Sequence, residues 1–199
     1  HMMFTDPPYG VDYTGGHFHS GDVNIKRERE RLAGDKTDMY TRFLPVVLPF
    51  VDGPCYVWFA SSVGKPVYDA VLGYGCEIHA MIVWNKTNAT YAAMNAQYKQ
   101  RHEPLLYFKP NGSTLRWTGP TNECTVWDIP RDSINEYHPT QKPVALASRA
   151  IGNHDAPVVA DFFAGSGSTI IAAENLSRQC RAVEISPAYV AVALQRYSD

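Results

Sequence analysis

Short apolar runs of strand length alternate along the chain with segments whose apolar residues recur at helical spacing. We predict six strands, at residues 3–5, 55–60, 78–84, 103–108, 158–161 and 181–184. The run at 55–60 is continuous, as in a strand that is buried on both faces of a sheet. Helical spacing predicts five helices, at residues 39–50, 63–72, 142–151, 168–176 and 187–197. Strands that alternate with helices predict an α/β domain around a largely parallel sheet.

Two long stretches lack such a pattern. Residues 10–38 are rich in glycine and carry alternating charges between Lys26 and Arg31, so we predict a mobile loop of the kind that serves as a lid or binding loop. Residues 109–137 contain turn signals such as Asn111-Gly112 and Gly119-Pro120, and we predict a second loop there. No internal repeat is visible, and we expect a single domain over residues 1–199.

The composition is typical of a folded protein that is not exported. Hydrophobic residues make up 45% and charged residues 19% of the 199 residues, which excludes a wholly disordered chain. No apolar run is long enough to span a bilayer and no leader opens the chain, so we expect a soluble, cytoplasmic protein with no membrane partner. The net charge of −2 argues against a protein that coats DNA, but it is compatible with one local groove for nucleic acid.

The sequence contains no recognisable metal-binding pattern. Its four cysteines are far apart and form no C-x-x-C pair, and we interpret them as free thiols. His17 and His19 lack the carboxylate or cysteine neighbours that a metal site would need. We therefore predict no metal site.

A glycine turn runs from Asp161 to Thr169, between a predicted strand and a predicted helix. Its glycines let the backbone turn sharply and approach a ligand at the helix N-terminus. The turn contains no lysine, which disfavours a phosphate-binding P-loop, and Ile170 stands where a dinucleotide fingerprint has its third glycine. Glu184 follows Gly165 by 19 positions, where a carboxylate can bind both hydroxyls of a ribose. We favour an adenosine-type cofactor over a purely structural turn.

A second turn, Asp6-Pro7-Pro8-Tyr9, follows the first predicted strand directly. Two prolines stiffen the turn and leave carbonyls free, so the Asp6 carboxylate and the Pro7 carbonyl can both accept hydrogen bonds from one –NH2 group. Two such acceptors favour the pyramidal, nucleophilic form of an aromatic amine. Tyr9 offers a flat face for a base that has left its stack. The alternative is an ordinary Asp-Pro turn at the end of a strand.

These motifs resemble those of the class β amino-methyltransferases, which act on adenine N6 or cytosine N4 of DNA. Asp6-Pro7-Pro8-Tyr9 precedes the glycine turn, which is the circularly permuted order of that class. Further segments that look like family motifs are Tyr56 to Ser62, Met81 to Lys86, Arg101 to Pro104 with Tyr107, and His138 to Pro143. The resemblance extends from about Phe4 to Tyr197. It is strongest for phage and prophage "DNA modification methylases" and the methyltransferase half of ParB-like fusions.

The resemblance implies a Rossmann-like methyltransferase fold and S-adenosylmethionine as the cofactor, with S-adenosylhomocysteine as the product. It implies that the catalytic residues are Asp6, Pro7, Pro8 and Tyr9. It implies that the cofactor is bound by Asp161, Phe163, Ala164, Gly165, Gly167, Ser168, Thr169, Glu184 and Ile185, with His138, Thr140 and Lys142 closing over its methionine end. The expected partner is DNA, either double-stranded with the target base flipped out or single-stranded, and a homodimer is compatible with the resemblance. We predict that the substrate is bound by Tyr9, Lys26, Arg27, Arg29 and Arg31.

The chain departs from the family pattern at two places. The family's strand with a Gly-Asp pair, upstream of the catalytic motif, has no counterpart before Asp6. The resemblance therefore implies about six main strands, in the order 2-1-4-5-7-6 of methyltransferase numbering, with an antiparallel hairpin at one edge. The family's target-recognition region lies before His138, and here residues 109–137 are the available segment. We expect a short or relaxed readout of DNA sequence.

Three alternatives to adenine N6 methylation remain open at this point. Cytosine N4 methylation uses the same chemistry, although Asp before the prolines favours adenine in this family. Methylation of RNA or of a glutamine amide uses related sites, but the permuted order and the segment from His138 to Pro143 argue against it. The third alternative is a protein that binds cofactor or nucleic acid and has lost activity. A restriction-modification role is among the biological roles that the resemblance implies.

Overall fold

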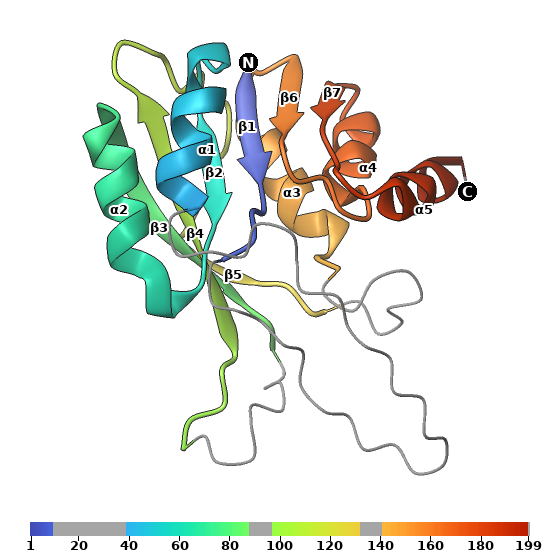
Figure 1. Ribbon diagram of the computed structural model, residues 1–199, viewed down its shortest axis with the longest axis horizontal. Helices are drawn as coiled ribbons and strands as arrows, with labels where there is room; N and C mark the ends of the chain where they lie inside the picture. The colour runs from blue at the N-terminus through green and yellow to red at the C-terminus, as the bar shows by residue number, and fades with distance from the viewer. Residues whose placement is uncertain (10–38, 88–96, 132–140, 199) are drawn as a thin grey trace.

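The computed structural model describes residues 1–9, 39–87, 97–131 and 141–198 (Figure 1). Within these residues seven strands form one sheet, in the order β5-β3-β4-β2-β1-β6-β7. The strands are β1 Met2–Thr5, β2 Cys55–Trp58, β3 Cys76–Asn85, β4 His102–Pro110, β5 Val126–Asp128, β6 Val158–Asp161 and β7 Gln179–Ala182. Only β4, among the strands described, runs antiparallel to its neighbours.

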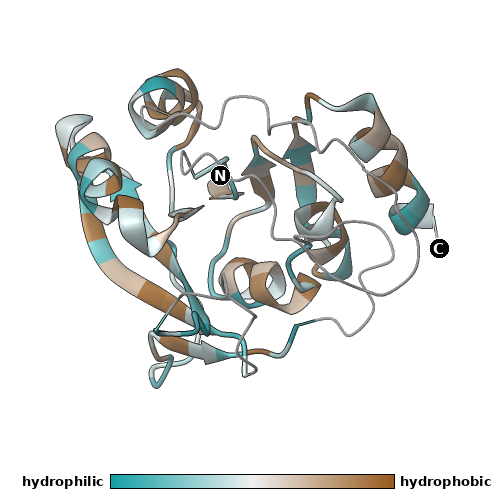
Figure 2. Cartoon of the chain, turned by 60° about the horizontal axis from the view of Figure 1, so that its bottom comes forward, coloured by the Kyte–Doolittle hydropathy of each residue, from teal (hydrophilic) through white to brown (hydrophobic). Residues whose placement is uncertain are grey.

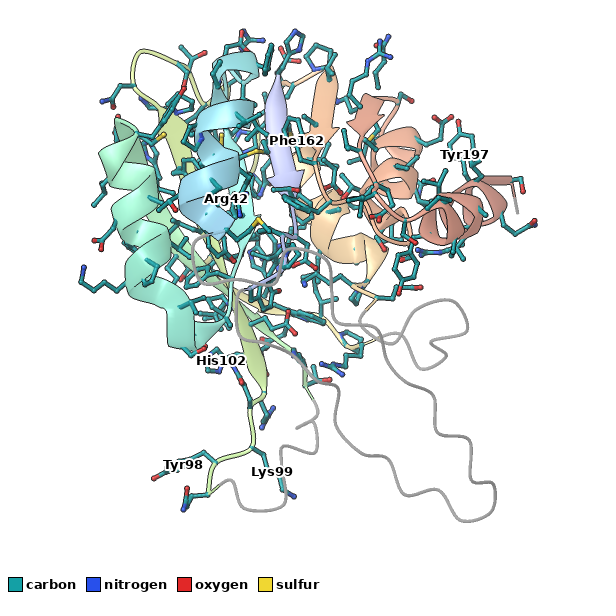
Figure 3. All side chains as sticks on the ribbon, in the orientation of Figure 1. Arg42, Tyr98, Lys99, His102, Phe162 and Tyr197 are labelled. Carbon is teal, nitrogen blue, oxygen red and sulfur yellow. The ribbon has the colours of Figure 1, made fainter. Side chains whose placement is uncertain are left out.

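Strand β1 is an inner strand of the sheet, between β2 and β6, and is buried along its whole length. Met3 pairs with Cys55 of β2 on one side and with Ala160 of β6 on the other, and all three strands are parallel. Their carboxyl ends therefore lie at the same edge of the sheet. Because β4 is antiparallel, it begins at this edge, where Figure 3 shows His102. The turns after β1 and β6 and the start of β4 are thus brought together.

Helices cover both faces of the sheet (Figures 1 and 2). The α-helices are α1 Met39–Val47, α2 Gly64–Gly73, α3 Val144–Gly152, α4 Ser168–Asn175 and α5 Pro187–Ser198. Two short 3-10 helices are η1 Leu48–Phe50 and η2 Ser61–Val63. Helices α1 and α2 pack on one face, α3 and α4 pack on the other, and α5 contacts α4. In the part of the chain that the structure describes, none of the helices is long and apolar enough to cross a membrane.

The packing of α1 shows how the apolar pattern produces this layer. Its buried residues Tyr40, Phe43, Leu44 and Val47 follow the i, i+3, i+4, i+7 spacing of one helical face. Burying that face against the sheet removes its apolar surface from water, which is the main force that holds the helix. The Tyr40 hydroxyl donates a 2.9 Å hydrogen bond to the carbonyl of Trp58, where β2 ends. Helix α1 is thereby tied to the edge at which the two predicted functional turns lie.

The expected strand order 2-1-4-5-7-6 is confirmed in the run β7-β6-β1-β2-β4-β3, with β3 and β4 as the antiparallel pair. The prediction of a loop over 109–137 is wrong at Val126–Asp128, which pairs with β3 and adds a seventh strand. The side chain of Trp127 explains this strand. It is buried beneath the sheet and its indole N–H donates to the carbonyl of Cys124 at 3.1 Å.

The last predicted strand is also displaced, since β7 ends at Ala182 and Glu184 lies beyond it. Beyond β7 the backbone nevertheless continues to form hydrogen bonds with the end of β6 and the residues that follow it. Val183 N–H donates to the carbonyl of Asp161 at 2.8 Å, and Ala164 N–H donates to the carbonyl of Val183 at 3.0 Å. These bonds hold Glu184 beside the glycine turn. The predicted mobile loop, residues 10–38, lies outside the described residues.

Candidate active site

The turn after β1 places two polar side chains together at the carboxyl edge of the sheet. The Tyr9 hydroxyl lies 2.8 Å from Asp6 Oδ1 and 3.2 Å from Glu103 Oε2, and its single proton serves one of these acceptors at a time. Burial and the two neighbouring carboxylates raise the pKa of Tyr9 well above its usual value. Tyr9 therefore stays a neutral hydrogen-bond donor over the physiological range.

Lys142 reaches the same place from the segment just before α3. Its ammonium group is ion-paired with Asp6 Oδ2, lies 3.2 Å from Glu103 Oε2 and donates to the Tyr9 hydroxyl at 2.9 Å. It also lies 4.9 Å from the centre of the Trp58 ring, a cation–π distance. Burial by itself would lower the pKa of Lys142, but the carboxylates of Asp6 and Glu103 outweigh burial and raise it. The lysine is therefore a permanent cation at the catalytic motif.

Glu103, the second residue of β4, joins this group to a second lysine. It is ion-paired through Oε1 with Lys86, which lies just beyond β3 and is only 5% exposed, and Arg131 lies 4.0 Å away. Burial would raise the pKa of Glu103, but Lys142 and Lys86 bring it down to about 2. Asp6, Glu103, Lys86 and Lys142 thus form a compact cluster of alternating charges.

Glu103 and Lys86 were not among the predicted site residues. Each lies in a segment that resembles a family motif, Met81 to Lys86 and Arg101 to Pro104. The sequence signal for such residues was an ionisable side chain at the end of a strand that is otherwise largely buried. Lys86 and Glu103 were missed because it is the pairing of β3 with β4 that brings them together.

The glycine turn after β6 has the backbone conformation that its sequence predicts. Gly165 and Gly167 have φ angles of +51° and +83°, in the left-handed region that favours glycine. A Cβ atom at Gly167 would lie 2.8 Å from the Cβ of Ala193 on α5, so a side chain does not fit there. A Cβ at Gly165 would meet no atom within 4 Å, so this side of the turn is open to a ligand.

Glu184 is held rigidly against this turn. Its Oε2 accepts a 2.8 Å hydrogen bond from Gly165 N–H, and its Oε1 accepts one of the same length from Ser186 N–H. A carboxylate has about four acceptor positions, so both oxygens retain capacity for further donors such as hydroxyl groups. Ile185 beside it is 82% exposed.

Asp161 at the end of β6 organises the start of the turn. Its Oδ1 accepts hydrogen bonds from the Thr5 hydroxyl at 2.8 Å and from Phe163 N–H at 3.1 Å. Burial raises its pKa to about 6 even though these bonds and one from Thr169 favour the charged form. At the other end of the turn, the Ser168 hydroxyl donates to the carbonyl of Lys142 at 2.8 Å. The glycine turn is thereby attached to both β1 and Lys142.

The structure thus brings most of the predicted residues to one edge of the sheet. Those that meet there are Asp6, Pro7, Pro8 and Tyr9, the turn residues Asp161, Phe163, Ala164, Gly165, Gly167, Ser168 and Thr169, and Lys142, Glu184 and Ile185. The ammonium group of Lys142 lies on the catalytic motif, and contact of this residue with a cofactor stays a prediction. The other predicted site residues, His138, Thr140, Lys26, Arg27, Arg29 and Arg31, lie outside the described residues.

Comparison with known proteins finds relatives of this chain in sequence. The sequence profile of the family described as "DNA methylase" matches residues 1–195. The chain is 24% identical over 228 residues to the type II methyltransferase M2.DpnII of Streptococcus pneumoniae, covering 98% of this chain and 81% of that protein. It is 27% identical over 233 residues to the DNA adenine methyltransferase YhdJ of Escherichia coli K12, covering 98% of this chain and 75% of that protein.

Solved structures share the fold over the whole chain. The M1.HpyAVI complex with S-adenosylmethionine superposes with a TM-score of 0.72 at 24% identity, covering 100% of this chain and 88% of that one. The cytosine-N4-specific PvuII DNA methyltransferase superposes with a TM-score of 0.76 at 18% identity, covering 100% and 79%. The predicted Rossmann-like α/β fold is confirmed.

Proposed function

Since the chain belongs to the DNA methylase family, and is therefore a DNA amino-methyltransferase that uses S-adenosylmethionine, we propose that it methylates the exocyclic N6 of adenine. The family includes enzymes for adenine N6 and for cytosine N4, and the choice of adenine is the proposal. The observation that supports transfer to an amino group is the position of Asp6 and Tyr9 next to the glycine turn, and the aspartate before the two prolines supports adenine as the base. The hydrogen bond from Thr5 to Asp161 holds the two motifs side by side.

Asp6 supplies the chemistry that an aromatic amine requires. The lone pair of such an amine is delocalised into the ring, which makes the nitrogen a poor nucleophile. Hydrogen bonds from its –NH2 group to the Asp6 carboxylate and the Pro7 carbonyl favour the pyramidal geometry that develops in the transition state. The Tyr9 hydroxyl, 2.8 Å from Asp6 Oδ1, fixes the orientation of the carboxylate for this role.

The glycine turn and Glu184 fit the cofactor. The open side of Gly165 admits a ligand close to the backbone, and the remaining acceptor positions of Glu184 suit the two ribose hydroxyls. S-adenosylmethionine supplies a methyl group on a cationic sulfur. On transfer, the bond from sulfur to the methyl carbon would break as the bond to the target nitrogen forms, one proton of the amino group would pass to water, and S-adenosylhomocysteine would remain.

The aspartate before the two prolines favours adenine as the base. Type II methyltransferases and a DNA adenine methyltransferase are among the relatives of the chain, and a cytosine-N4-specific enzyme is among its structural neighbours. Cytosine N4 is therefore the second candidate. Both bases present the same –NH2 chemistry to Asp6.

Either base must leave its stack before Asp6 can reach the amino group. We propose that Tyr9 stacks on the extruded base and that Lys26, Arg27, Arg29 and Arg31 contact DNA phosphates. The proposal for the four basic residues rests on the sequence alone, because they lie outside the described residues.

Incubation with methyl-labelled S-adenosylmethionine and DNA of varied sequence tests this function directly. After digestion to nucleosides, mass spectrometry identifies the base and the atom that carry the label. We expect N6-methyladenine, with no label in RNA or protein controls. Label on cytosine N4 would replace adenine by the second candidate, and label on RNA or protein instead of DNA would overturn the proposal.

A further inference from the structure

The ammonium group of Lys142 occupies the place on Asp6 that the proposed reaction gives to the target amino group. Asp6 Oδ1 lies 2.8 Å from the Tyr9 hydroxyl, and Oδ2 is ion-paired with Lys142. A base that donates its –NH2 hydrogens to this carboxylate must compete with the lysine. The inference drawn from this competition rests on the proposed function.

The surroundings of Lys142 suit a cation and make it costly to leave that cation unpaired. The side chain is 13% exposed, and its ammonium lies 4.9 Å from the centre of the Trp58 ring and 5.4 Å from that of Tyr9. Removing the single partner of a buried charge is strongly destabilising because the charge then lacks both water and a counter-ion. Lys142 can therefore release Asp6 only if another anion receives it.

Glu103 is placed to be that anion. Its Oε2 lies 3.2 Å from the Lys142 ammonium, so the lysine already has a second carboxylate within reach. Its Oε1 is ion-paired with the buried Lys86, and Arg131 lies 4.0 Å away. Glu103 is thus anchored independently of Lys142 and stays in place when the lysine moves.

The backbone of Lys142 is anchored as well. Its carbonyl accepts the hydrogen bond from Ser168, the first residue of α4. Movement of the lysine is thereby confined to its flexible side chain, whose tip has to shift only from a position shared by two carboxylates to one of them.

We propose that Lys142 and Glu103 form an ion-pair exchange in front of Asp6. Lys142 pairs with Asp6 before the target base enters, and it moves wholly onto Glu103 when the target amino group takes its place. No covalent bond or proton changes in this step. Glu103 is a positioning residue, because it acts through Lys142 and does not touch the reacting atoms.

The first test is Glu103→Gln, which removes the anion that receives the lysine. Lys142 then stays on Asp6 and competes with the base, so we expect the KM for DNA to rise about tenfold or more. At saturating DNA we expect kcat to fall by less than about threefold, since the chemistry after base entry is unchanged. Cofactor affinity, measured by calorimetry, should stay within about twofold because the charged partners of Glu103 in the described structure are Lys86, Arg131 and Lys142.

The second test adds Lys142→Gln to Glu103→Gln. Without the competing cation, the KM for DNA should return to within about threefold of that of Lys142→Gln alone. If the role of Glu103 were merely structural, the raised KM of Glu103→Gln would persist in the double variant. Glu77→Gln is the matched control, because Glu77 also pairs with a lysine across β3 and β4, at 2.8 Å from Lys109, but far from Asp6. It should leave KM and kcat unchanged.

An unchanged KM in Glu103→Gln, or a raised KM that Lys142→Gln does not relieve, overturns the exchange while DNA methylation by the unaltered protein still stands. Failure of the unaltered protein to methylate DNA overturns the proposed function itself and the exchange with it. If Glu103→Gln does not fold, Glu103→Asp replaces it. This variant keeps the charge but withdraws it by one methylene, and a smaller rise in KM is expected.

Discussion

The hydroxyl of Thr5 donates a 2.8 Å hydrogen bond to Oδ1 of Asp161, although 156 residues separate them in the chain. The same hydroxyl oxygen accepts a 3.1 Å hydrogen bond from Phe162 N–H. Thr5 is the last residue of β1 and Asp161 is the last residue of β6. One buried side chain thus sets the spacing between the catalytic turn and the glycine turn.

Replacing Thr5 by Val should therefore weaken both the fold and the site. Asp161 loses a donor and Phe162 N–H loses its acceptor in a buried place, so we expect the free energy of unfolding to fall by about 1–3 kcal/mol. Urea unfolding measures this loss. Thr5→Ser keeps the hydroxyl and serves as the control, and equal stability of the Val and Ser variants would contradict the role assigned to the hydrogen bonds.

Glu184→Ala should weaken the binding of S-adenosylmethionine by about 1–3 kcal/mol, since hydrogen bonds to a charged carboxylate are lost. Calorimetry with the isolated protein measures the affinity. Glu184→Gln retains one acceptor oxygen for Gly165 or Ser186 and is expected to lie between Ala and the unaltered protein. Unchanged affinity in the Ala variant would exclude the assignment to the ribose hydroxyls.

Asp6→Ala should leave cofactor affinity largely unchanged, because the hydrogen-bond and ion-pair partners of Asp6 in the described structure are Tyr9 and Lys142. The loss of one preorganised electrostatic partner should lower kcat by about 10²–10³. Single-turnover methylation with excess enzyme measures the chemical step. Activity within a few-fold of the unaltered protein would show that Asp6 is not the acceptor for the amino group.

Because His154 is buried and neutral, we expect it to lower the stability of the protein in acid. It is fully buried, its ring lies 2.8 Å from the Tyr56 hydroxyl and 2.6 Å from the carbonyl of Leu115, and burial lowers its pKa to about 4. In the unfolded chain His154 takes up a proton near pH 6.5, whereas in the folded protein it stays neutral down to about pH 4. The contribution of His154 to stability is therefore complete above pH 6.5 and is lost as the pH falls toward 4. Between pH 7.5 and 4.5 the unaltered protein should lose about 2–3 kcal/mol more than His154→Gln does.

Unfolding by urea at each pH measures this difference. Asp161, whose raised pKa acts in the opposite direction as the pH falls, is present in both proteins, so its contribution cancels. Parallel pH profiles for the two proteins would show that His154 is not the group responsible.

Reversing the charge of Arg27, Arg29 and Arg31 should lower DNA affinity and flatten its dependence on salt. Each lost phosphate contact reduces the slope of log affinity against log salt by about 0.9 for duplex DNA. Binding titrations at several salt concentrations measure the slope, and cofactor affinity should not change. An unaltered slope would show that these residues make no contact with phosphates.

Several features of this protein follow from short segments of sequence. A strand followed by Asp6-Pro7-Pro8-Tyr9, and another followed by the glycine turn, are local patterns that depend on backbone stiffness at proline and freedom at glycine. The alternation of strands and helices then predicts a parallel sheet whose carboxyl ends meet at one edge. The convergence of both turns on that edge was therefore predictable from the sequence alone.

Strand β5 was not predictable in the same way. The segment around it is dominated by turn residues, and only three residues, Val126–Asp128, pair with β3. What favours the strand is the burial of Trp127 against the sheet and α3. A short strand that depends on such a tertiary contact leaves little periodicity in the sequence.

The charge cluster at the active site is the part that only the tertiary structure decided. Lys142 and Asp6 are 136 residues apart, and Lys86 meets Glu103 through the pairing of β3 with β4. Composition and spacing identify each residue as ionisable, but they do not say which charges become neighbours. That choice is made by packing, because the desolvation of a buried charge is tolerated only where the fold brings an opposite charge within contact distance.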